Sequence, residues 1–68
     1  MRTYYVTVHA VNDRRWFHLG TGIFRAKSEK DAEVLGMERF WDERLSCTDC
    51  SPIVEATDIE KSFEDMPD

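Results

Sequence analysis

The sequence feature that most constrains the fold of this chain is a strict two-residue alternation in residues 3–10. Every second side chain of the segment is apolar: Tyr4, Val6, Val8 and Ala10. The residues between them form the other face: Tyr5, Thr7 and His9. This period of two, with aromatic and β-branched residues, predicts a strand whose apolar face places it at the centre of a sheet. A chain of 68 residues has room for one sheet and one helix, which excludes a dinucleotide-binding fold or a deep-pocket barrel.

Residues 16–26 predict a second strand, joined to the first by a turn at Asn12-Asp13 with Arg14 and Arg15 beside its tip. Two apolar pairs in this strand have opposite parity: Phe17 with Leu19, and Phe24 with Ala26. A β-bulge at Gly20-Thr21-Gly22 would shift the register by one residue and turn both pairs to one buried face. A phosphate-binding loop would need a helix start and further glycines directly after this segment, and neither is present.

Residues 29–45 predict a helix that begins after an N-cap at Ser28, with Asp31 at the third helical position. One apolar stripe consists of Ala32, Gly36 and Phe40, and a second of Val34, Met37, Trp41 and Leu45. Glycine costs about 1 kcal/mol relative to alanine inside a helix. We therefore expect Gly36 to mark a close approach of the helix to the sheet.

Residues 46–52 predict a loop, and residues 53–59 a third strand whose buried face is either Ile53/Ile59 or Val54/Ala56. The order β-β-α-β predicts an α+β fold. Its three-stranded antiparallel sheet has the order 2-1-3, with one helix packed on one face. We expect a single domain over residues 1–61 and an acidic, frayed tail over residues 62–68.

The formal charge of −5 comes entirely from residues 55–68, which carry six acids against Lys61. Residues 1–54 carry eight acids and eight bases. An acidic end disfavours direct nucleic-acid binding and attracts basic protein surfaces. With no long apolar segment and no secretory signal pattern, we expect a cytoplasmic protein that does not enter a membrane.

Cys47 and Cys50 form a Cys-x-x-Cys pair, and His9 with His18 would complete a ligand set for tetrahedral zinc. The order and spacing are unlike those of a zinc finger. A redox pair would sit at a helix N-terminus, whereas this one follows the predicted helix. We expect free loop thiols, histidines that are solvated neighbours across the hairpin, no cofactor and no catalytic set.

Trp16 and Trp41 are the residues best suited to an interface, since tryptophan provides a large rigid contact area. Trp16 is equally suited to the core. The second helical stripe is more than one small sheet can cover, so Val34, Met37 and Trp41 predict an apolar patch. A homodimer through this helix would bury the patch, and docking of Phe63 or Met66 onto Trp41 is the alternative.

The run Phe24-Arg25-Ala26-Lys27-Ser28-Glu29-Lys30-Asp31-Ala32-Glu33 resembles the strand-to-helix joint of small phage and prophage proteins, including some anti-CRISPR inhibitors. The resemblance covers residues 24–40. It implies a host protein as partner, bound stoichiometrically, often through an acidic surface that occupies a nucleic-acid-binding site.

The sequence therefore predicts a non-enzymatic binding protein, an anti-CRISPR-like inhibitor of a host complex with a basic or nucleic-acid-binding surface. The predicted partner-binding residues are Trp41, Asp58, Glu60, Phe63, Glu64 and Asp65. The alternative is a zinc-stabilised structural or adaptor module that uses Cys47 and Cys50.

Overall fold

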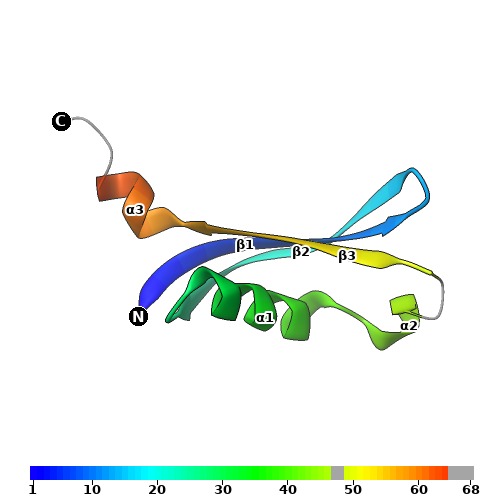
Figure 1. The fold of residues 1–68 in the computed structure, drawn as a ribbon, viewed down its shortest axis with the longest axis horizontal. Helices are drawn as coiled ribbons and strands as arrows, with labels where there is room; N and C mark the ends of the chain where they lie inside the picture. The colour runs from blue at the N-terminus through cyan, green and yellow to red at the C-terminus, as the bar shows by residue number, and fades with distance from the viewer. Residues whose placement is uncertain (47–48, 65–68) are drawn as a thin grey trace.

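The three strands form one antiparallel sheet in the order β2-β1-β3, as the sequence predicts. The computed structural model describes residues 1–46 and 49–64. The strands are β1 (Arg2–Asn12), β2 (Arg15–Ala26) and β3 (Ser51–Asp58), and the helices are α1 (Glu29–Phe40), α2 (Glu43–Ser46) and α3 (Ile59–Glu64). Figure 1 shows α1 running along one side of the sheet, while α3 lies beyond one end of it.

The predicted β-bulge lies at Leu19, beside Gly20. Val8 pairs with Gly20 while His9 pairs with His18, so Leu19 is the extra residue on β2. The shift aligns Phe17 with Ala10 and Phe24 with Tyr4 on the face that α1 covers, as expected. Phe17 is nevertheless 47% exposed. The tip of the β1–β2 hairpin bends away from the side that α1 covers, so the helix does not cover Phe17 (Figure 1).

The core lies between β1 and α1 and consists mostly of small side chains. Its buried apolar residues are Tyr4, Val6, Val8, Ala10, Ala26 and Ala32. Gly36 confirms the expected close approach, because a Cβ atom there would lie 2.5 Å from Cγ1 of Val6. On β3, Val54 and Ala56 pack against the core, which decides between the two predicted buried faces.

The prediction of one helix to residue 45 is wrong. Trp41 adopts extended backbone angles (φ −76°, ψ 132°), and its N–H donates to the Met37 carbonyl at 2.9 Å, which ends α1 at Phe40. The carboxylate of Asp42 then accepts the N–H of Arg44 at 2.9 Å and starts the short helix α2. Met37 and Trp41 both pack against the core cluster, so part of the predicted second stripe is covered.

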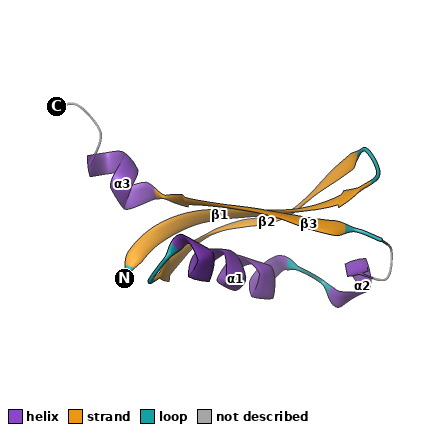
Figure 2. Ribbon diagram, in the orientation of Figure 1, coloured by secondary structure: helices purple, strands orange, loops and turns teal. Residues whose placement is uncertain are grey.

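The end of the chain also differs from the prediction. The third strand ends at Asp58, and Ile59 begins α3, which was predicted as strand and tail. Oδ1 of Asp58 accepts the N–H of Lys61 at 3.0 Å, the geometry of a helix N-cap. This helix crosses the expected domain boundary between residues 61 and 62. Figure 2 shows α3 as a helix at the end of β3.

Candidate functional site on the open face of the sheet

The sheet has one face that α1 does not cover. Because residues opposite each other in an antiparallel sheet point to the same side, the register defines this face. β1 contributes Thr3, Tyr5, Thr7, His9 and Val11. Their partners are Trp16, His18, Thr21, Ile23 and Arg25 on β2, and Ser51, Ile53, Glu55 and Thr57 on β3. We call this surface the open face.

Large apolar side chains stand out of the open face. Trp16 is 60% exposed, Ile23 65% and Tyr5 46%. Among the residues that the strand register places on this face, Arg25 and Glu55 carry the formal charges, one of each sign. Exposed aromatic and aliphatic groups on a nearly neutral surface are typical of a protein-contact site and unlike a phosphate-binding surface.

The rings of His9, His18 and Trp16 form a cluster beside the β-bulge. The ring centroids of His9 and His18 lie 5.4 Å apart, and those of His9 and Trp16 lie 5.7 Å apart, both with edge-to-face geometry. The two histidines are therefore neighbours across the hairpin, as predicted. Trp16 belongs to this exposed cluster, which decides the open question about its place.

His18 contacts a threonine of the same strand. Nε2 of His18 lies 2.6 Å from Oγ1 of Thr21, and Oγ1 of Thr21 lies 3.5 Å from Oγ1 of Thr7. In the tautomer that carries its proton on Nε2, His18 donates to Thr21 and keeps a lone pair on Nδ1. Nδ1 of His9 is enclosed and has no hydrogen-bond partner in the described structure.

The contact between His18 and Thr21 resembles the base–hydroxyl pair of a nucleophile site. Such a site also needs a third group that orients the imidazole, and a concave pocket around the substrate. Among the described residues, neither histidine bonds to a carboxylate. The cluster lies on an exposed sheet surface. The described residues therefore give no geometric argument for a nucleophile site here.

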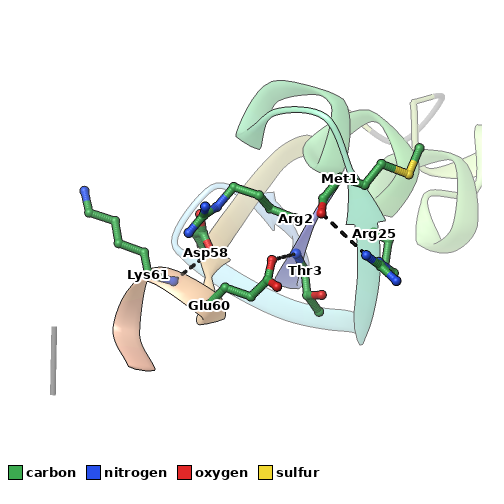
Figure 3. Close-up of polar contacts among 7 residues, drawn as sticks. All are labelled: Met1, Arg2, Thr3, Arg25, Asp58, Glu60 and Lys61. Atoms are coloured by element: carbon green, nitrogen blue, oxygen red, sulfur yellow. Dashed lines mark hydrogen bonds and ion pairs between the residues drawn. The ribbon is translucent and has the colours of Figure 1, made fainter. Parts of the chain in front are cut away.

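Two of the predicted partner-binding acids make contacts within the chain (Figure 3). Nε of Arg2 donates to Oδ2 of Asp58 at 2.5 Å, and the carboxylate of Glu60 accepts the N–H of Thr3 at 2.8 Å. The hydrogen bond from Arg2 holds the pKa of Asp58 below its usual value. These acids therefore attach α3 to the start of β1.

The other predicted residues are only partly within the described structure. Trp41 is half-buried and packs against the core cluster. The side chains of Phe63 and Glu64, and all of Asp65, lie outside the described residues. The structure therefore does not bring the six predicted residues together into one described surface.

Cys50 is half-buried, and its N–H donates to the Leu45 carbonyl at 3.3 Å. Cys47 lies outside the described residues, so the geometry of the Cys-x-x-Cys pair is not described. Within the described part of the chain, no three His, Cys, Asp or Glu side chains form a group that could hold a metal ion.

The sequence analysis did not name Tyr5 and Ile23 as partner-binding residues, and it did not identify Asp58 as a helix cap. The alternation along residues 3–10 already assigned Tyr5 to the face opposite Val6 and Val8. The signal for the cap was an Asp directly before the helix-compatible run Ile59-Glu60-Lys61.

Comparison with protein-family models, curated proteins and solved structures gave no match. No helix in the described part of the chain is long and apolar enough to cross a membrane.

Proposed function

We propose that this chain is a non-catalytic protein-binding module that contacts its partner through the open face of the sheet. The observation that carries the proposal is the exposure of Trp16, Ile23 and Tyr5 on the face opposite α1. Tryptophan and tyrosine dominate binding energy at protein interfaces because they bury large rigid surfaces at low entropic cost. This location replaces Trp41, which packs against the core.

The inhibitory role implied by the anti-CRISPR resemblance is the more specific part of the proposal. In that role the module would occupy a basic or nucleic-acid-binding surface of a host complex. The acidic residues near α3 would steer the approach, since charges at the rim act mainly on the association rate. The open face would supply the affinity.

The test compares capture of a host protein by the wild-type chain and by two matched double variants. Trp16→Ser/Ile23→Ser removes two large apolar groups from the open face. Val34→Ser/Leu35→Ser removes two from the outer side of α1, where Val34 is 50% and Leu35 36% exposed. We expect at least a tenfold loss of affinity in the first variant and less than a threefold change in the second. Equal retention by both variants contradicts the proposal.

A third variant, Glu64→Gln/Asp65→Asn, tests the electrostatic part. It leaves Asp58 and Glu60 in place, because these two acids hold β1 and their loss would disturb the fold. We expect slower association at low salt and little change at high salt. Binding that is unchanged at both salt concentrations rejects the electrostatic part and leaves the role of the open face intact.

A further inference from the structure

The spacing of the two imidazoles on the open face matches that of a pair of metal ligands. With a metal–nitrogen bond of about 2.0–2.1 Å and a tetrahedral angle at the metal, the centroids of two ligating imidazoles lie about 5.2 Å apart. The centroids of His9 and His18 lie 5.4 Å apart. The separation of the two rings is therefore compatible with two imidazoles that share one ion.

The contact of His18 with Thr21 also suits a metal ligand. A ligating histidine usually donates its second ring N–H to a nearby oxygen, which fixes the tautomer and the ring orientation. Oγ1 of Thr21 lies 2.6 Å from Nε2 of His18 and can accept such a bond. In that tautomer, Nδ1 of His18 keeps its lone pair for a metal ion.

Nδ1 of His9 is also suited to bind a metal ion. This nitrogen is enclosed without a hydrogen-bond partner in the described structure, and an unsatisfied polar atom of this kind costs free energy. A cation bound to its lone pair would satisfy it. Histidine binds metals through the lone pair of a neutral imidazole.

We propose that His9 and His18 bind a divalent transition-metal ion of the zinc type in a tetrahedral site. Imidazole pairs suit zinc and its neighbours in the first transition row rather than magnesium or calcium, which prefer oxygen ligands. No third His, Cys, Asp or Glu of the described residues joins the pair, so two positions stay open to water or to a partner's side chain. This inference does not rest on the proposed function.

The test titrates Zn²⁺ alone into the isolated 68-residue chain, prepared free of metal, and follows backbone and side-chain signals by NMR. We expect saturable shifts at both imidazoles and at the indole N–H of Trp16, whose ring contacts His9. His9→Gln and His18→Gln should each weaken zinc binding at least tenfold. Amide dispersion measured without metal shows that each variant is folded.

A positioning variant and a control separate this site from other zinc ligands. Thr21→Val should weaken binding several-fold and Thr21→Ser should restore it, since only serine keeps the acceptor for His18. Cys47→Ser/Cys50→Ser should change the affinity less than twofold. Shifts that centre on Cys50 and vanish in the cysteine variant overturn the proposal, as does an absence of shifts at millimolar Zn²⁺.

Discussion

The ring of Phe40 in α1 lies directly over Gly20 in β2, so closely that a Cβ atom on Gly20 would overlap the ring. Gly22 lies under the same ring, where a Cβ atom would be 3.3 Å from Cζ of Phe40. Phe24 meets Phe40 edge-to-face, with centroids 6.1 Å apart. The absence of side chains at the two glycines therefore leaves room for the ring of Phe40, in addition to their place near the bulge.

Gly20→Ala should reduce the free energy of unfolding by about 1–3 kcal/mol, the usual cost of forcing a methyl group into a packed contact. Because the clash is with one ring, Gly20→Ala in a Phe40→Ala background should cost much less than in the wild type. Urea denaturation of the four proteins in this cycle measures both values. An equal loss of unfolding free energy in the two backgrounds would show that the ring of Phe40 does not lie against Gly20.

Gly36→Ala should also destabilise the protein, although alanine is the better helix former by about 1 kcal/mol. The new methyl group would meet Cγ1 of Val6 at 2.5 Å, and the overlap outweighs the gain in helix propensity. In a Val6→Ala background the clash is gone and Gly36→Ala should become stabilising. Thermal unfolding followed by circular dichroism checks the reversal of sign.

Ser28→Ala should destabilise the protein by about 1 kcal/mol, because Oγ of Ser28 accepts the N–H of Asp31 at 3.2 Å at the start of α1. Ser28→Asp keeps an acceptor at this position and should retain most of the stability. A shift in melting temperature of about 4–8 °C for Ser28→Ala is the expected size in a domain this small. An equal loss in both variants would rule out the cap.

The contribution of Asp58 should depend on pH. Its pKa is lowered in the folded protein, first by the hydrogen bond from Arg2, so the contact stabilises the fold above the unfolded pKa of Asp. This stabilisation is lost as the pH falls from about 4 through the lower folded pKa. NMR titration of the Asp58 carboxyl should show the pKa moving back toward its usual value in Arg2→Gln. An unchanged pKa in that variant would exclude Arg2 as the main cause.

The homodimer through α1 stays a prediction. The structure leaves fewer of the three predicted patch residues exposed for such an interface. Met37 and Trp41 pack against the core, and Val34 is 50% exposed. Trp41→Lys should therefore lower the melting temperature whether or not a dimer forms. Val34→Lys should leave the melting temperature within a few degrees and dissociate a dimer, if one forms through this surface. Light scattering across a concentration series decides, and a wild-type chain that is monomeric at millimolar concentration rejects the dimer.

Local patterns in the sequence were sufficient for much of the fold. The alternation along residues 3–10 identified the central strand and its buried side, because side-chain direction in a strand has a period of two. Ser28 marked the start of α1 through a hydrogen bond that spans three residues. Gly36 signalled a close contact, since a glycine inside a helix is costly without one.

Other features depended on residues far apart in the sequence. α1 ends at Phe40 although helix-compatible residues continue, and Trp41 leaves the helix with extended backbone angles and packs on the core. The buried side of β3 followed from its register with β1, for which both parities had similar apolar content. Asp58 became a partner of Arg2 only because the sheet order places the start of β1 beside the end of β3.

The candidate site shows the same division. The sequence alone determined that His9 and His18 lie on paired strands and that one face of the sheet carries Tyr5. The tertiary structure decided that the strand pairing shifts by one residue at Leu19, directly after the aligned histidines, and that Trp16 joins them in one ring cluster. The physical reason is that strand period is a local property of the backbone. Register and ring contacts are instead set by the sum of interactions between strands that the sequence keeps apart.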